Sequence, residues 1–202
     1  MKHHDARNIL INRTIAVIAE EGMEKTTTKA IVSGTDINEV YIYRLFADKD
    51  DLLAKAFESL DEELVAKAMQ HIAVMYMPEL DYETRCRLYF FAIWKFLLGN
   101  REKCLAFIRY YYSPQFQLYS VEKHKERYAP LVSKFEEAFK REAEVWLILN
   151  HILNVMLYFA IKVHNNQMPA EDNYSEHVFR VVYASIQQYF KEKEEDSHEE
   201  GA

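Results

Sequence analysis

The sequence predicts an all-α protein made of a small N-terminal bundle and a larger helical domain. Half of the 202 residues are hydrophobic, yet the chain has only four Gly and four Pro, which favours long helices with few connections. Alternating β-branched runs, which would indicate strands, do not occur in the sequence. We expect a three-helix bundle over residues 1–47, a helical domain over 48–191 and an acidic disordered tail over 192–202.

The first helix is expected over residues 5–21. Ile11, Ile15 and Ile18 mark its buried stripe, together with Leu10 and Ala19. The glycine at position 22 should end this helix, because glycine readily takes the left-handed conformation of a helix C-terminus.

Residues 26–49 then read as a short helix, a tight turn and a second short helix. The hydroxyl groups of Thr26, Thr27 and Thr28 can cap the first of these helices. This helix is expected to bury Ile31 and Val32. The turn covers residues 34–36, and we expect Asp36 to take the left-handed conformation there.

The second short helix begins at Asn38, which can cap it, and runs to Phe46. Ile42, Leu45 and Phe46 form its inward stripe at i, i+3 and i+4. Its other face carries side chains that a buried helix would not favour: Glu39, Tyr41, Tyr43 and Arg44. This arrangement is typical of a helix-turn-helix motif that reads DNA.

The larger domain should begin with a long helix over residues 48–78. Asp48 and Asp51 form a capping-box-like start, and Pro78 closes the helix. Its length makes it the natural connection between two functional regions. Further helices are expected over residues 82–98, 101–112, 116–140, 142–164 and 173–191.

At this point the chain resembles the TetR family of one-component transcriptional regulators. The matching positions are Thr26-Thr27, Ile31-Val32, Thr35-Asp36-Ile37, Asn38, Ile42-Tyr43-Arg44-Leu45-Phe46 and Lys49. Asp36 replaces the turn glycine that is customary in the family, and Glu39 and Val40 depart from common residues at their positions. These departures bear on the operator sequence rather than on the fold.

The chemistry of the motif predicts a set of DNA-binding residues. Arg44 and Lys49 suit phosphates, and the resemblance implies a phosphate contact for Tyr43. Glu39 can accept a hydrogen bond from a cytosine amino group, and Val40 and Tyr41 can make apolar contact with a thymine methyl group. The predicted set is Thr27, Thr28, Lys29, Asn38, Glu39, Val40, Tyr41, Tyr43, Arg44 and Lys49. The net charge of −7 and the near-neutral first 50 residues argue against a strongly electrostatic interface.

The resemblance further implies a small-molecule effector site in the larger domain. The aromatic content of this region predicts a hydrophobic or aromatic ligand, although aromatic stripes at helical spacing are also typical of an ordinary core. The predicted ligand-binding residues are Phe90, Trp94, Tyr111, Phe116, Tyr119, Tyr128, Phe135, Trp146 and Asn150.

In the family resembled, the last two long helices pair with those of a second copy. The predicted interface residues are Ile152, Met156, Phe159, Val178, Val182, Ile186 and Tyr189, with a plain monomer core as the alternative. Residues 145–163 are apolar enough to suggest a membrane span, but polar side chains at positions 150, 151 and 154 argue against insertion. We expect this helix to be buried on most faces instead.

Catalytic and metal-binding patterns are missing from the sequence, so we expect no enzyme, no metal and no cofactor. Cys86 and Cys104 each lie in an apolar helical pattern. We expect both to be reduced thiols in the cytoplasm. The sequence therefore predicts a cytoplasmic, homodimeric transcriptional regulator. It is expected to be a repressor that a small effector releases from a palindromic DNA operator. The alternative is a helical-bundle protein that binds a small molecule or lipid, or an enzyme, without DNA binding.

Overall fold

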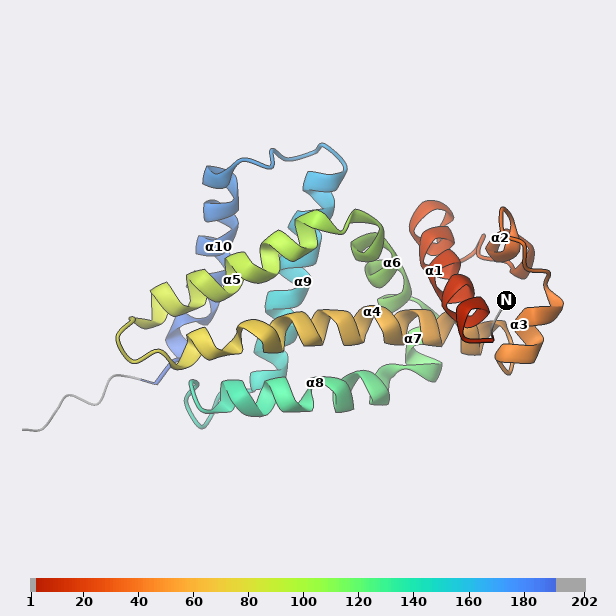
Figure 1. The fold of residues 1–202 in the computed structure, drawn as a ribbon. Helices are drawn as coiled ribbons and strands as arrows, with labels where there is room; N and C mark the ends of the chain where they lie inside the picture. Colours follow the sequence, from red (N-terminus) through yellow and green to blue (C-terminus); the bar gives the residue numbers. More distant parts are fainter. Residues whose placement is uncertain (1–2, 192–202) are drawn as a thin grey trace, which may run out of the picture.

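The computed structural model describes residues 3–191 and confirms the all-α fold (Figure 1). The helices are α1 (His3–Glu21), α2 (Thr28–Val32), α3 (Val40–Leu45), α4 (Lys49–His71), α5 (Tyr82–Gly99), α6 (Arg101–Tyr111), α7 (Pro114–Tyr119), α8 (Val121–Glu136), α9 (Val145–His164) and α10 (Asp172–Ile186). Two 3-10 helices, η1 (Ile72–Tyr76) and η2 (Gln187–Tyr189), follow α4 and α10. The predicted acidic tail lies outside the described residues.

Helices α1 to α3 form the small bundle at one end of the molecule (Figure 1). Its core is built from apolar side chains of all three helices, the segments that flank α3 and the first turn of α4: Ala6, Leu10, Ile31, Ile37, Ile42, Phe46 and Leu52. Two arginines of α1 strengthen this packing. Arg7 Nη1 donates to the Leu45 carbonyl at 2.9 Å, and Arg13 Nη2 donates to the Ser33 carbonyl at 3.1 Å. Since both carbonyls end a helix, α1 fixes the ends of α2 and α3.

The turn between α2 and α3 differs from the prediction in one detail. The left-handed residue is Gly34, with φ +76°, and not Asp36. A glycine takes this conformation without the steric cost that a Cβ would bring, so Gly34 supplies the reversal and Asp36 does not need to.

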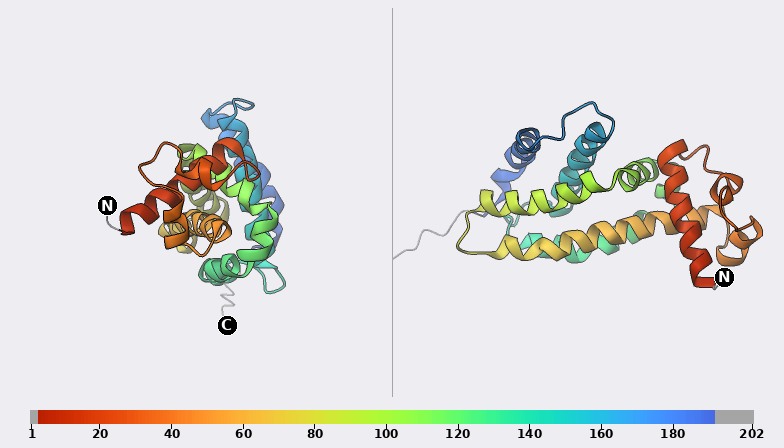
Figure 2. Two further views of the ribbon diagram at one scale, coloured as in Figure 1. Left: turned by 90° about the vertical axis from the view of Figure 1, so that its right-hand side faces the viewer. Right: turned by 45° about the horizontal axis from the view of Figure 1, so that its top comes forward.

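Helix α4 runs from the small bundle through the larger domain, as Figure 1 shows. Its start resembles a capping box: Asp51 N donates to Asp48 Oδ1 at 2.8 Å, and Asp51 Oδ2 accepts from the N–H of Ala47, the residue before the cap, at 3.0 Å. Helices α5, α6 and α8 pack along α4, and α9 packs against α5, α6, α8 and α10. Figure 2 shows that α9 and α10 lie together on one side of the molecule.

Three predicted helices end or divide differently in the structure. The helix expected to Pro78 changes at His71 into η1, and the last helix becomes η2 after Ile186. The single helix expected over 116–140 is divided at Ser120 into α7 and α8. The Ser120 hydroxyl is buried and hydrogen-bonded to the Tyr110 hydroxyl at 2.9 Å, and this long-range contact holds Ser120 at the junction.

Helix α9 is not buried on most faces, contrary to expectation. It is long and apolar enough to cross a membrane by length and composition, and 28% of its most apolar window is buried within the described chain. One chain therefore covers only part of this apolar helix.

Candidate DNA-binding surface and interior cavities

Helix α3 turns one face inward and the other to solvent, as the sequence predicted. Ile42 is 0% exposed and Phe46 4%, whereas Val40 is 55% and Tyr43 60% exposed. Arg44 is also exposed, and its guanidinium lies 5.4 Å from the centre of the half-buried Tyr41 ring. The outward face thus presents apolar, phenolic and cationic groups side by side.

One side-chain contact joins the start of α3 to α2, and local hydrogen bonds cap the start of each helix. The Thr28 hydroxyl donates to the Glu39 carboxylate, which lies at the position just before α3. Asn38 Oδ1 accepts from Val40 N at 3.1 Å, and Thr27 Oγ1 accepts from Ala30 N at 3.1 Å. Glu39 is therefore tied to the neighbouring helix as well as exposed, a contact that its sequence position did not indicate.

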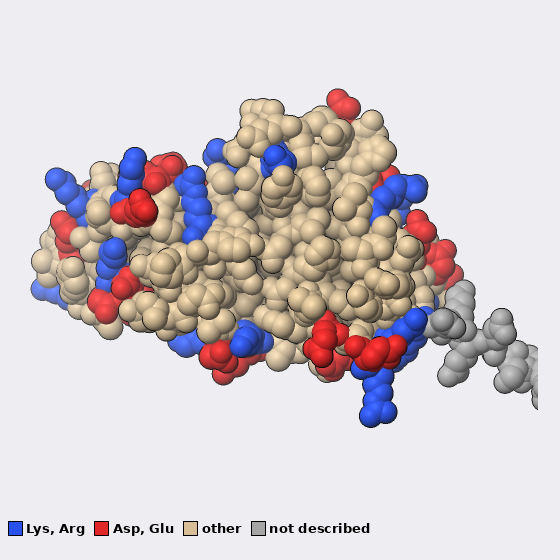
Figure 3. Space-filling view, turned by 180° about the vertical axis from the view of Figure 1, so that it is seen from behind, with Lys and Arg blue, Asp and Glu red and all other residues tan. Residues whose placement is uncertain are grey.

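The remaining predicted DNA-binding groups are cations at the edge of the motif. Lys29 on α2 is exposed, and Lys49 at the start of α4 is half-buried. The small bundle shows both signs of charge, intermingled, on the face seen in Figure 3. The structure therefore agrees with the near-neutral charge of this segment.

The larger domain contains two adjacent apolar pockets of about 60 Å³ each, which share part of their lining, and we call them two lobes of one cavity. One lobe reaches α10, and the other reaches α4. They share five lining residues, namely Tyr89, Ile93, Leu149, Ile152 and Met156. Among the described residues, neither lobe is lined by a charged side chain.

Only three of the nine predicted ligand-binding residues line this cavity. Phe90 and Phe135 line the lobe near α10, and Tyr128 lines the other. Aromatic composition could not identify the residues that line this cavity, because their membership depends on how α5, α8 and α9 cross.

The other six residues have different surroundings. Trp94 Nε1 donates to Ser175 Oγ at 2.8 Å, and the Tyr111 hydroxyl donates to Asn150 Oδ1 at 2.9 Å. Phe116 is buried, and Trp146 packs against the His124 ring. Tyr119 is half exposed and lines a separate polar recess of about 200 Å³ between α4, α7 and α8.

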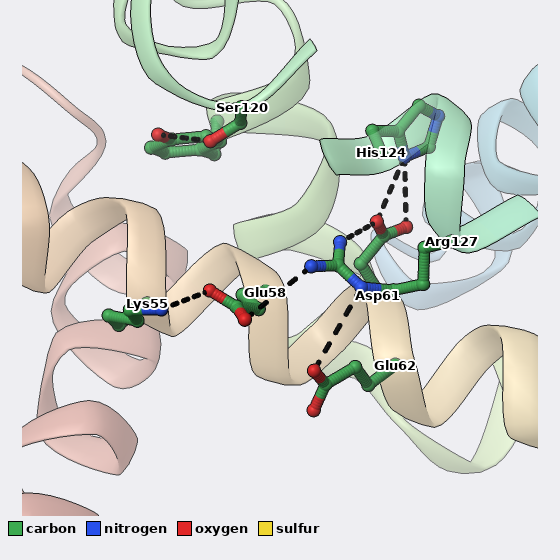
Figure 4. A network of polar contacts seen from close by, with 8 residues as sticks. Lys55, Glu58, Asp61, Glu62, Ser120, His124 and Arg127 are labelled. Carbon is green, nitrogen blue, oxygen red and sulfur yellow. Dashed lines mark hydrogen bonds and ion pairs between the residues drawn. The ribbon is translucent and has the colours of Figure 1, made fainter. Parts of the chain in front are cut away.

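A buried polar network connects α4 to α8 (Figure 4). Asp61 is 0% exposed, and its carboxylate lies 3.0 Å from His124 Nδ1 and 2.6 Å from Arg127 Nη1. Arg127 also lies 3.6 Å from Glu58 and 3.9 Å from Glu62. The residues predicted from the sequence did not include this network. The available signal was an acidic residue within the apolar stripe that Phe57 and Leu64 mark on α4.

The predicted dimer-interface residues divide between the interior and the surface. Met156, Val178, Val182 and Ile186 are buried inside the chain, at 3–5% exposure, so the prediction that they face outward is corrected. Their stripe packs into the core because α9 and α10 close the cavity. Ile152 also lines the cavity, Phe159 is half-buried and Tyr189 is exposed.

A different set of apolar side chains points outward from α9 and α10. Leu147, Tyr158 and Val181 are 67%, 55% and 56% exposed. Figure 3 shows a broad area with few charged side chains on the side where Figure 2 places these helices. We call this area the α9–α10 face, defined by these three residues.

Metal-binding and reactive-thiol chemistry find little support in the structure. No group of three or more His, Cys, Asp or Glu that could hold a metal occurs within the part of the chain that is described. Cys86 and Cys104 are free and buried, and burial raises the pKa of each thiol to about 12.

Comparisons with known proteins agree with this architecture. The model of the family "Bacterial regulatory proteins, tetR family" matches residues 10–56. No curated protein matches the chain in sequence. A TetR family transcription regulator from Marinobacter aquaeolei VT8 is similar in structure, with a TM-score of 0.71 and 15% identity over 92% of this chain and 98% of that one.

Two further similar structures have names that describe a function. The fatty acid degradation regulator FadR from Bacillus halodurans has a TM-score of 0.66 and 16% identity, over 87% of this chain and 96% of that chain. The multidrug binding protein EbrR, in complex with imidazole, has a TM-score of 0.61 and 15% identity, over 88% and 89%.

The helix-turn-helix geometry, the match over residues 10–56 and the shared fold lead to one conclusion. Residues 10–56 are a TetR-family helix-turn-helix segment, and the chain as a whole shares its fold with TetR family transcription regulators.

Proposed function

We propose that the protein is a cytoplasmic, homodimeric repressor that a small hydrophobic or aromatic effector releases from a palindromic operator. Residues 1–47 bind DNA, and residues 48–191 bind the effector and the second subunit. The observation that carries this proposal is the orientation of α3, whose exposed Tyr43 and Arg44 stand opposite the buried Ile42. A helix anchored in this way can enter a major groove while its core stays intact.

The α9–α10 face supports the dimer. Exposed apolar area of this extent usually marks an interaction site in soluble proteins. A two-fold dimer through this face buries Leu147, Tyr158 and Val181 and brings together two copies of α3. Two reading helices one helical turn of DNA apart then match a palindromic operator.

The internal cavity supports the effector. Its lining is apolar apart from tyrosine hydroxyls, which suits a hydrophobic ligand. The free volume is small, so a ligand must displace side chains, and Met75 and Met156 in the lining are flexible enough to repack. The names of two similar structures, a multidrug binding protein and a fatty acid degradation regulator, agree with an apolar ligand class.

Helix α6 offers a route from the cavity to the DNA-binding domain. Arg109 Nη1 on α6 donates to the Ile18 and Ala19 carbonyls at the end of α1, both at 2.8 Å. The same helix bonds to α9 through Tyr111 and Asn150. A ligand that binds one arrangement of α6 and α9 more tightly shifts the dimer population, and tenfold weaker operator binding needs about 1.4 kcal/mol of coupling.

The proposal is tested by DNA binding of purified protein to its own upstream region, with fluorescence anisotropy as the readout. Tyr43→Ala should weaken binding to all DNA at least about tenfold, because a phosphate contact and its packing are lost. Glu39→Ala should mainly change sequence preference. Leu118→Ala, at an exposed leucine on α7 that lies outside both α3 and the α9–α10 face, is the control and should not change affinity. Unchanged affinity in both motif variants would show that α3 is not the reading helix.

A further inference from the structure

Two buried polar atoms next to the cavity have no hydrogen-bond partner. His124 is 2% exposed and Tyr128 6% exposed. Within the described residues, neither His124 Nε2 nor the Tyr128 hydroxyl makes a hydrogen bond. A buried polar atom without a hydrogen bond lowers the stability of a folded protein and is rare. Both atoms are therefore candidates for hydrogen bonds to a bound ligand.

The hydrogen-bonding roles of the two atoms follow from the Asp61 network. An Asp61 carboxylate that pairs with Arg127 is an acceptor only, so His124 Nδ1 must carry the hydrogen that faces it. In the neutral ring Nε2 then carries a lone pair, and Figure 4 shows this nitrogen facing away from Asp61. The Tyr128 hydroxyl can donate. The pair therefore offers one acceptor and one donor.

Tyr128 adjoins the α4 lobe of the cavity directly, and His124 adjoins Tyr128 without lining either lobe. Tyr128 lines this lobe, and the His124 ring lies one turn earlier on α8, with its centre 4.5 Å from that of Tyr128. Aromatic rings enclose the imidazole, including those of Tyr111 and Trp146. A ligand in the apolar lobe can therefore place one polar atom at this end and leave its remaining atoms among hydrocarbon.

Charge near the site restricts the class of that polar group. Neither lobe is lined by a cation within the described chain. Burial raises the pKa of Tyr128 well above its ordinary value, and the nearby Asp61 charge and a side-chain interaction of the hydroxyl with Asp61 raise it further. The same charge repels an anionic ligand. A carboxylate is therefore disfavoured, and a neutral group that both donates and accepts fits the pair.

We propose that the effector is an apolar molecule with a neutral hydroxyl group, a phenol or an alcohol, whose hydroxyl donates to His124 Nε2 and accepts from Tyr128. This inference rests on the proposed function for the existence of an effector, and it adds the effector's chemical class and its polar anchor. The apolar part lies between Tyr89, Leu149 and Met156, where the two lobes meet.

Isothermal titration of the full-length protein at neutral pH tests the proposal with three probes of similar size. They are 4-propylphenol, propylbenzene and 4-propylbenzoate. The phenol should bind at least about tenfold more tightly than the benzoate, because only the benzoate brings a charge into the cavity. Tyr128→Phe should lower the affinity for 4-propylphenol about tenfold and change the affinity for propylbenzene by less than about twofold. Only the phenol has a hydroxyl group that would lose its hydrogen-bond donor.

Two controls separate binding from folding. Tyr174→Phe removes a hydroxyl on the surface of α10 and should change no affinity. The melting temperature of ligand-free Tyr128→Phe should equal or exceed that of the wild type, because the hydroxyl removed is unpaired. A clear fall in melting temperature would show that this hydroxyl already has a partner in the free protein, and would overturn the proposal.

DNA anisotropy on the same samples distinguishes this inference from the proposed function. If 4-propylphenol and propylbenzene release DNA equally well from the wild type and from Tyr128→Phe, the proposed hydroxyl anchor is wrong. The proposed function as a ligand-responsive regulator would still hold. Binding of none of the three probes also overturns it. Phenol binding that depends on Tyr128 but does not affect DNA would support the site and contradict its effector role.

Discussion

Replacement of Asp61 by Asn should destabilise the protein by about 2–4 kcal/mol. The side chain is 0% exposed and serves two donors, His124 Nδ1 at 3.0 Å and Arg127 Nη1 at 2.6 Å. Asn keeps the shape but turns an NH₂ group toward one of these donors. A charge-assisted hydrogen bond contributes about 1.5–3 kcal/mol to the free energy of unfolding. A buried donor that is left without an acceptor destabilises the fold further. Arg127 retains Glu58 at 3.6 Å, which limits the total.

Urea unfolding followed by circular dichroism measures this change. Protein concentration is held constant, because a dimer's apparent stability depends on it. Glu62→Gln is the control: its carboxylate is 61% exposed and 3.9 Å from Arg127, so we expect a change below about 0.5 kcal/mol. If Asp61→Asn unfolds at the same urea concentration as the control, the buried network does not stabilise the fold and this reasoning is refuted.

Two further predictions concern the same helix and the domain junction. Burial opposes ionisation of Glu58, but its hydrogen bond to Lys55 and nearby positive charges outweigh burial and lower its pKa below the ordinary 4.5. Its contribution is therefore complete above pH about 4.5 and is lost as pH falls through the lowered pKa; Glu58→Gln should flatten this acid-side loss in unfolding experiments. Arg109→Ala removes two hydrogen bonds to the end of α1 and should cost about 1–3 kcal/mol; hydrogen exchange should accelerate in α1, and unchanged exchange would contradict the proposed link.

Local pattern was sufficient where a segment's own residues decide its structure. The inward stripe of Ile42 and Phe46 and the capping pair Asp48 and Asp51 follow from spacing alone, and the structure confirms both. The reversal before α3 shows the limit of such patterns. Gly34 and Asp36 both suit a left-handed turn, and the choice between them depends on how α2 and α3 pack on α1.

Helix boundaries failed where a distant residue intervenes. No local signal marks Ser120 as a break, because its anchor is the hydroxyl of Tyr110 on another helix. The same limit applies to the buried stripe of α10. The spacing of Val178, Val182 and Ile186 shows that they share one face, but it cannot show whether that face meets the core or a second subunit. The structure places it in the core.

The sequence alone determined the helical class, the helix-turn-helix arrangement and which side of α3 faces solvent, because hydrophobic periodicity and caps act within a few residues. Only the tertiary structure decided which aromatic residues surround the cavity, that Asp61 meets His124 and Arg127, and which face of α9 remains uncovered. These contacts join residues that lie far apart in the chain, and helix crossing angles, which no short segment encodes, bring them together.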